Sequence, residues 1–233
     1  MVKAVFFDID DTLYSYTEAH KPALKAMKEY AARELGVSED AYDDYVRQAQ
    51  AVVKRRVGRD CSTLHNRLIR FQCMLEILGR PIFPHAEVMG KLYWDTLIDH
   101  MQEEEGAGEL LKTLKERGYY VGIGTNMTAG VQFRKLAKLG FGPWIDGMVT
   151  SEEAGVQKPD PKLFLLCAEK AGVSPEECVF VGDSLKKDVL GACAAGMKAI
   201  LYRKEPAGGT VQEESCCQVV SNLGDCLKVL EKM

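Results

Sequence analysis

Residues 4–12 read AVFFDIDDT, a short apolar run that ends abruptly in acidic residues. The uninterrupted apolar segment 4–7 is typical of a strand buried on both faces of a parallel sheet. Asp8 and Asp10 follow two positions apart, and residues at this spacing in an extended chain point to the same side. The stretch therefore predicts a central strand that delivers two carboxylates to its carboxyl end.

Beyond Gly106, apolar strands alternate with amphipathic helices, which indicates an α/β fold built on a parallel sheet. The helix after the second core strand is expected to pack through Phe133, Leu136 and Ala137, and the last helix through a leucine stripe that begins at Leu223. The further strands are expected at 119–124, 146–150, 178–181 and 198–202.

Between the first strand and Gly106 the pattern is helical, with breaks at Gly36, Gly58 and Gly79. The gap from Asp10 to Thr125 is too long for one crossover, so an inserted helical block is expected to fill it. The helices are expected near 17–35, 39–57, 61–79 and 84–102. The resulting division is a core made of 1–14 and 96–233, with an all-helical cap at 15–95.

Composition excludes several classes of protein. The 233 residues are 46% apolar and 27% charged, an ordinary globular balance. A net charge of −4 argues against a general nucleic-acid coat, which needs a dense basic surface. No signal peptide and no apolar run near 18 residues is seen, so we expect a cytoplasmic protein without a membrane partner.

The eight cysteines form no C-x-x-C pair, so common zinc and redox spacings are absent. We expect all of them to be reduced thiols in a cytosolic protein. They are Cys61, Cys73, Cys167, Cys178, Cys193, Cys216, Cys217 and Cys226.

Polar side chains follow three of the expected strands: Asp8 and Asp10, Thr125 and Asn126, and Asp183. Ligands of open parallel sheets bind beyond these carboxyl ends. Paired carboxylates suit Mg²⁺, and a hydroxyl beside backbone N–H groups suits a phosphate. Each signal alone also fits a capping residue or an acidic turn.

Lys158 lies in a loop stiffened by Pro159 and Pro161, which can aim one ammonium group at a fixed point. A solvated loop lysine is the alternative. Asp188 follows Asp183 by five residues and belongs to the same acidic group.

Taken in order, these segments resemble the motifs of the haloacid dehalogenase superfamily. Asp8-Ile9-Asp10-Asp11-Thr12 looks like its first motif, Thr125 matches the second, Lys158 before Pro159 the third, and Gly182-Asp183 with Asp188 the fourth. The match runs over almost the whole chain and implies a Rossmann-like core with an inserted helical cap. Lys187 is a departure, because many members carry Asn there.

The resemblance implies a Mg²⁺-dependent phosphatase that works through an aspartyl-phosphate intermediate. Its substrate would be a small phosphorylated metabolite, such as a nucleoside monophosphate or a sugar phosphate. Asp8 would be the nucleophile, and Asp10 the acid and base, with a pKa raised by the neighbouring Asp8. The remaining implied roles are phosphate binding by Thr125, Asn126 and Lys158, metal binding by Asp8, Asp10 and Asp183, and orientation of the site by Asp188.

Other readings stay open. The same fold can serve a non-catalytic phosphate-binding or regulatory protein. A phosphomutase or a dehalogenase of the superfamily is a further alternative, although Asp10 favours phosphoryl transfer. The basic run of the cap is expected to be a solvated face or a site for a second anionic group, and the four histidines are expected to be structural. The oligomeric state cannot be read from the sequence.

Overall fold

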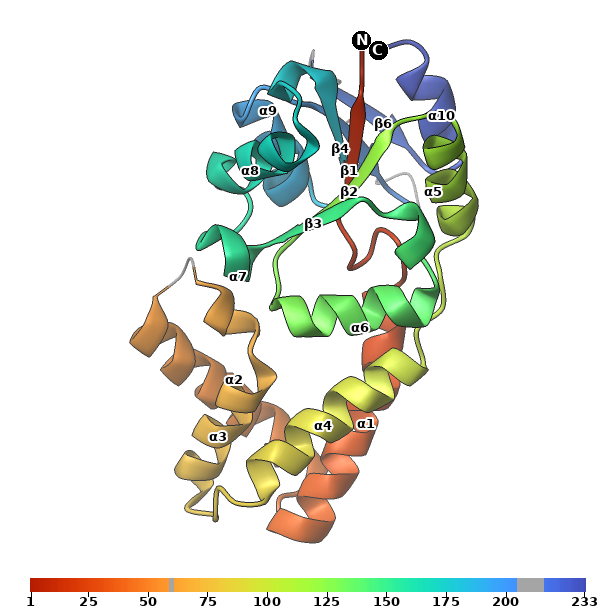
Figure 1. Cartoon of the computed structure of the whole chain (residues 1–233). Helices are drawn as coiled ribbons and strands as arrows, with labels where there is room; N and C mark the ends of the chain where they lie inside the picture. The colour runs from red at the N-terminus through yellow and green to blue at the C-terminus, as the bar shows by residue number, and fades with distance from the viewer. Residues whose placement is uncertain (59–60, 205–215) are drawn as a thin grey trace.

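A computed structural model describes residues 1–58, 61–204 and 216–233. In these ranges the chain forms one six-stranded sheet in the order β3-β2-β1-β4-β5-β6, and all neighbouring strands are parallel (Figure 1). The predicted fold class is therefore confirmed. The strands are β1 (Ala4–Phe7), β2 (Tyr120–Thr125), β3 (Gly147–Thr150), β4 (Cys178–Gly182), β5 (Lys198–Tyr202) and β6 (Cys217–Val220).

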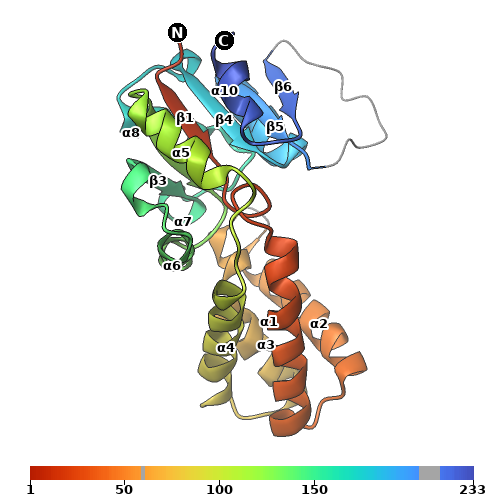
Figure 2. The same cartoon turned by 90° about the vertical axis from the view of Figure 1, so that its right-hand side faces the viewer.

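Strand β1 is buried on both faces because helices cover both sides of the sheet (Figure 2). Val5 and Phe7 belong to the apolar cluster that includes α5 (Ala107–Glu116) and α10 (Asp225–Leu230). Ala4 and Phe6 belong to the opposite cluster, which includes α8 (Pro161–Ala171) and α9 (Leu190–Ala194). This alternation explains why the N-terminal run is apolar without a break.

Four helices form a separate unit below the sheet (Figure 2). They are α1 (Tyr16–Tyr30), α2 (Glu39–Val57), α3 (Arg67–Leu78) and α4 (His85–Asp99). A π-helical turn at Ala31–Leu35 extends α1, and a 3₁₀ turn at Ser62–His65 precedes α3. We propose this unit as the cap, with the expected limits of 15 and 95, although α4 itself continues to Asp99.

The two connections between this helical unit and the sheet lie side by side. Tyr14 forms isolated bridges with Asp10 and with Glu103, and the N–H of Glu104 donates to the carbonyl of Leu13 over 2.8 Å. The chain therefore leaves the core and returns to it at one place.

The remaining elements of the core carry loops toward the carboxyl edge of the sheet. Helix α6 (Ala129–Leu139) follows β2, and the short α7 (Ser151–Ala154) follows β3. Single turns lie at Gly142–Trp144, Pro175–Glu177 and Leu185–Val189. No helix within the described ranges is both long and apolar enough to cross a membrane.

Three details differ from the sequence-based expectations. Strand β6 was not predicted, because its residues Cys217–Val220 follow a polar stretch. Phe133 is 64% exposed, whereas Gln132 and Lys135 on the same helix are buried. Cys193 and Cys216 form a disulfide, so the expectation that all cysteines are reduced is wrong for this pair. The two cysteines are 23 residues apart, and only the fold brings them together.

Candidate active site

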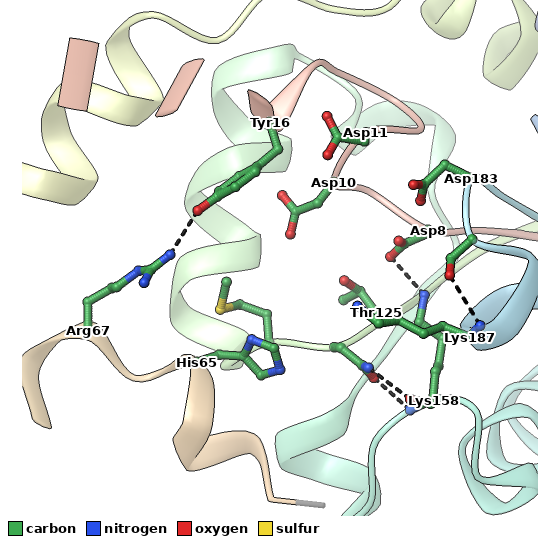
Figure 3. Close-up of a pocket in the computed structure, with 13 residues that line it drawn as sticks. Asp8, Asp10, Asp11, Tyr16, His65, Arg67, Thr125, Lys158, Asp183 and Lys187 are labelled. Carbon is green, nitrogen blue, oxygen red and sulfur yellow. Dashed lines mark hydrogen bonds and ion pairs between the residues drawn. The ribbon is translucent and has the colours of Figure 1, made fainter. Parts of the chain in front are cut away.

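A cavity of about 310 Å³ lies where β1, β2 and β4 end, between the sheet and the helical cap (Figure 3). The chain order of the strands reverses around β1, and such switch points are where open α/β sheets bind ligands. The sequence-predicted residues that line the cavity are Asp8, Asp10, Thr125, Asn126, Lys158 and Asp183.

Lys158 is the central cation of the core side of the cavity. Its side chain is 1% exposed, and Nζ lies 2.9 Å from Asp8 Oδ1 and 2.7 Å from Asp188 Oδ1. Nζ also donates to the carbonyl of Gly124 over 2.9 Å. Burial opposes its charge, but Asp188 and Asp8 outweigh burial and raise the pKa of Lys158. The ammonium group is therefore charged and fixed beside Asp8.

Asp8, Asp183 and Asp188 form a carboxylate cluster whose ligand atoms all lie within 4.8 Å of one another. Burial raises the pKa of Asp8 to about 6, with further contributions from Asp188 and Asp10, although Lys158 opposes the rise. Burial, Asp8 and Asp188 raise the pKa of Asp183 to about 7. Carboxylates that resist ionisation together fit a divalent cation, which would remove their repulsion and take oxygen ligands.

Within this cluster, Asp188 is already engaged. Besides its ion pair with Lys158, its Oδ2 accepts from the backbone N–H of Ser184 over 2.9 Å. A Cβ at Gly182 would lie 2.5 Å from the Asp188 carboxyl carbon, so a glycine is needed for the carboxylate to pack there. Asp8 and Asp183 are thus the side chains better placed to hold a metal, while Asp188 orients Lys158.

Asp10 occupies a different electrostatic environment from Asp8. Its Oδ1 lies 2.5 Å from Nζ of Lys135, a fully buried lysine of α6, and accepts from the Tyr14 hydroxyl. Burial would raise the pKa of Asp10, but Lys135 and Tyr14 outweigh burial and lower it. The expectation of a raised pKa is therefore wrong for this structure, because a buried partner cation was not visible in the sequence.

The turn after β1 is held by local contacts. Asp11 has a φ of 58°, a left-handed conformation that Asp tolerates better than most residues. Its Oδ1 accepts from the backbone N–H of Thr17 over 3.1 Å. This tight turn starts α1 immediately after the two catalytic candidates.

Thr125 ends β2 with its side chain buried, and its hydroxyl has a defined orientation. Gln132 Nε2 donates to Thr125 Oγ1 over 2.7 Å, and an amide nitrogen can only donate. The hydroxyl oxygen therefore acts as the acceptor, which leaves its single hydrogen free for a phosphate oxygen in the cavity. Gln132 was missed by the sequence analysis, which placed apolar residues on this face of the helix.

We expect Gln132→Met to lower kcat/KM for phosphate release by roughly 3- to 10-fold, the effect of one lost hydrogen bond. Thr125→Val removes the hydroxyl that Gln132 orients, so the two losses should not add in the double variant. Steady-state kinetics of the four proteins measures this coupling. If Gln132→Met lowers kcat/KM by the same factor in Thr125→Val as in the wild type, Gln132 does not act by orienting the Thr125 hydroxyl.

Asn126, predicted to bind phosphate, lines the cavity and makes side-chain hydrogen bonds to the backbone of Lys158. Its Oδ1 accepts from the backbone N–H of Lys158 over 2.7 Å, and its Nδ2 donates to the carbonyl of the same residue over 3.2 Å. The side chain therefore clamps the Lys158 loop to the end of β2.

The cap lines the other side of the cavity with residues that were not among the site residues predicted from the sequence. Arg67 and Tyr16 face the core carboxylates across the cavity, and Arg67 Nη2 donates to the Tyr16 hydroxyl over 2.8 Å (Figure 3). His65, expected to be structural, lines the cavity and bonds Gln157 of the core over 3.1 Å. The basic run Lys54 to Arg56 ends α2 on an exposed face, and Arg59 lies outside the described residues.

The site combines a buried lysine with a carboxylate cluster at the switch point of a parallel sheet, next to the helical cap. This combination defines a capped hydrolase with a doubly wound core. The chain belongs to the haloacid dehalogenase-like hydrolases, since the model of that family matches residues 2–196. This confirms the family expected from the motifs.

Three relatives illustrate the likeness. A glyceraldehyde 3-phosphate phosphatase of Methanopyrus kandleri is 37% identical over 211 residues, which are 88% of this chain and 85% of that protein. A ribulose-1,5-bisphosphate 5-phosphatase of Halopiger xanaduensis is 34% identical over 205 residues, or 87% and 85%. A crystal structure of a phosphatase of this family from Thermococcus onnurineus has a TM-score of 0.76 at 27% identity and covers 98% of both chains. They support the expected phosphatase-type member of the family.

Proposed function

We propose that this enzyme is a Mg²⁺-dependent phosphatase that hydrolyses a small phosphorylated metabolite through an aspartyl-phosphate on Asp8. The observation that carries the proposal is the position of Asp8, which lines the cavity, contacts Lys158 and belongs to the carboxylate cluster. A cavity near 310 Å³ is at the small end of ligand sites, which favours a sugar phosphate over a nucleotide. The phosphatase relatives named for sugar phosphates agree with this choice.

In the proposed first step, an Asp8 oxygen attacks phosphorus and the bond to the leaving oxygen breaks. Lys158 and the Thr125 hydroxyl hold phosphate oxygens and stabilise the negative charge of the transition state. Asp10 gives its proton to the leaving oxygen. In the second step, Asp10 takes a proton from water, which attacks the phosphoryl group and frees Asp8.

The environment of Asp10 fits the second step directly, because its lowered pKa keeps it a carboxylate, the form that a base requires. The first step requires a proton on Asp10. The negative charge of the substrate phosphate favours this protonation, since a nearby like charge raises the pKa of a carboxyl. Lys135 favours loss of the proton from Asp10, because it stabilises the Asp10 carboxylate.

Asp8 and Asp183, with the backbone carbonyl of Asp10, would hold Mg²⁺. When bound, Mg²⁺ would screen the nucleophile from the phosphate and offset charge on the phosphoryl oxygens. Asp188 would keep Lys158 in place rather than bind the metal itself.

The alternatives predict different behaviour. A regulatory protein would bind phosphate without turnover, and the presence of both Asp8 and Asp10 argues against this role. A dehalogenase needs no acid for a halide, whereas Asp10 here lines the cavity. A phosphomutase would return the phosphoryl group to the substrate instead of water. Release of inorganic phosphate from a metabolite panel, with Mg²⁺ and with EDTA, separates these possibilities.

Mg²⁺ should stabilise the fold strongly at about pH 8 and weakly at about pH 5. In the metal-free protein the pKa values of Asp8 and Asp183, about 6 and about 7, exceed the unfolded value. Ionisation of these two carboxyl groups therefore destabilises the metal-free fold. The loss of stability begins as the pH rises above about 4 and is complete above about pH 8. Saturating Mg²⁺ should raise the melting temperature near pH 8 by roughly 5–10 °C.

Thermal melts at both pH values, with Mg²⁺ and with EDTA, measure this effect. Asp183→Asn serves as the control, because it should lose most of the rise near pH 8. A rise of the same size at both pH values would contradict the assignment of the metal to these carboxylates.

A further inference from the structure

Arg67 is a cation of the cavity that has no carboxylate partner among the residues that the structure describes. It begins α3, and within the described ranges its Nη2 donates to two hydroxyl groups, to Tyr16 over 2.8 Å and to Tyr93 over 3.2 Å. Its Nε is buried without any hydrogen-bond partner in the described part of the chain. The guanidinium also lies 4.8 Å above the ring of Tyr93.

Such an arrangement leaves a full positive charge uncompensated. Neutral hydroxyls and an aromatic face orient a guanidinium but do not cancel its charge, and a partly buried cation is costly without a counter-charge. Figure 3 shows that Arg67 lies across the cavity from Lys158. The position suits a ligand group other than the phosphoryl group that Asp8 attacks.

Apart from Lys187, the other charged groups of the cavity have partners or a separate role. Lys158 pairs with Asp8 and Asp188, and Asp10 pairs with Lys135. Asp183 is a ligand of the proposed metal. Lys187, exposed on the turn after β4, lines the same cavity and makes no ion pair in the described ranges. Two cations, one from the cap and one from the core, thus remain for a ligand.

We propose that Arg67 recognises a second anionic group on the substrate, at the end opposite the phosphoryl group that is removed. The substrate class is then a small phosphorylated metabolite with a second carboxylate or phosphate. Arg67 suits both groups, because its planar fork offers paired donors to either one. The proposal rests on the proposed phosphatase function and adds the chemistry of its substrate.

Matched substrate pairs test this subsite and identify the anion. One pair is 3-phosphoglycerate and glycerol 3-phosphate, which differ in a carboxylate; the other is ribulose 1,5-bisphosphate and ribulose 5-phosphate. For at least one pair, kcat/KM should favour the doubly anionic substrate by 10-fold or more. In Arg67→Gln this ratio should fall by roughly 10- to 100-fold, the effect of a lost charge-assisted contact.

Two further variants control for folding and for net charge. Arg67→Lys keeps the charge without the fork and should retain part of the preference. Arg55→Gln removes an exposed arginine of the same cap and should leave the ratio unchanged. The proposal is overturned if the wild-type enzyme prefers neither anionic substrate, or if Arg67→Gln keeps the wild-type ratio, as a purely structural arginine would.

A lack of phosphate release from every substrate would count against the phosphatase function, and binding then tests the subsite by itself. Calorimetry with Mg²⁺ present should show 2-phosphoglycolate binding at least 10-fold tighter than ethyl phosphate, which lacks the carboxylate. Arg67→Gln should abolish this difference. Ribulose 1,5-bisphosphate and ribulose 5-phosphate are compared in the same way, and equal binding within both pairs by the wild-type protein would overturn the proposal.

Discussion

An Asp8→Asn enzyme is expected to release phosphate at least roughly 10⁴-fold more slowly than the wild type, because a carboxamide cannot replace the nucleophile. The measurement is release of inorganic phosphate from the best metabolite found in the panel, with Mg²⁺ present. A rate within 10-fold of the wild type would rule out attack by Asp8.

The loss should not come from unfolding. The pKa of Asp8, raised to about 6, means that its ionised form destabilises the metal-free fold above that pH. Asparagine removes this charge, so the melting temperature in EDTA near pH 8 should be no lower than that of the wild type. Asp11→Asn is the matched control, because Asp11 lies in the same turn and bonds the backbone of Thr17. It should keep most of the activity.

Asp10→Asn is expected to lower kcat for an alkyl phosphate by roughly 10²- to 10⁴-fold, the usual contribution of general acid–base catalysis. An alkoxide leaves poorly without a proton, whereas p-nitrophenolate leaves well without one. The variant should therefore lose much less activity in the formation of the intermediate from p-nitrophenyl phosphate.

Rapid mixing separates the two steps. With p-nitrophenyl phosphate, Asp10→Asn should give a burst of p-nitrophenolate followed by slow turnover, because water attack lacks its base. Equal losses in the first step for alkyl and aryl substrates would contradict the role of Asp10 as an acid. The same result would leave the role of Asp8 intact.

The sequence predicted the parts of the site that backbone geometry determines. Parallel strands end at one edge of a sheet, so the residues after β1, β2 and β4 had to converge. Thr125 and Asp183 accordingly line one cavity with Asp8, and Lys158 reaches the same cavity from the loop between α7 and α8.

The sequence did not predict the residues that reach the site from helix faces. Gln132 and Lys135 lie one turn apart on α6, a spacing that also suits a solvated face. The burial of Lys135 depends on the cap, because its Nζ lies 5.4 Å from the ring centroid of Trp94 and 5.9 Å from that of Tyr16. Gln132 is buried against the core, where it bonds Thr125. The exposed Phe133 between Gln132 and Lys135 was the misleading signal. Arg67 was also not predicted, because the residues that bury it come from other helices, Tyr16 from α1 and Tyr93 from α4.

The adjacent crossings at Leu13–Tyr14 and Glu103–Glu104 have a consequence for how such enzymes diversify. Because the two junctions lie side by side, joined by the Glu104–Leu13 hydrogen bond and the bridge between Tyr14 and Glu103, the helical unit is inserted at a single point of the core. The cost of closing an inserted segment grows only slowly with its length. A replacement module of different size could be grafted between these junctions without shifting the register of any strand. Selectivity can therefore evolve by exchange of the insert while the reaction machinery of the core stays unchanged.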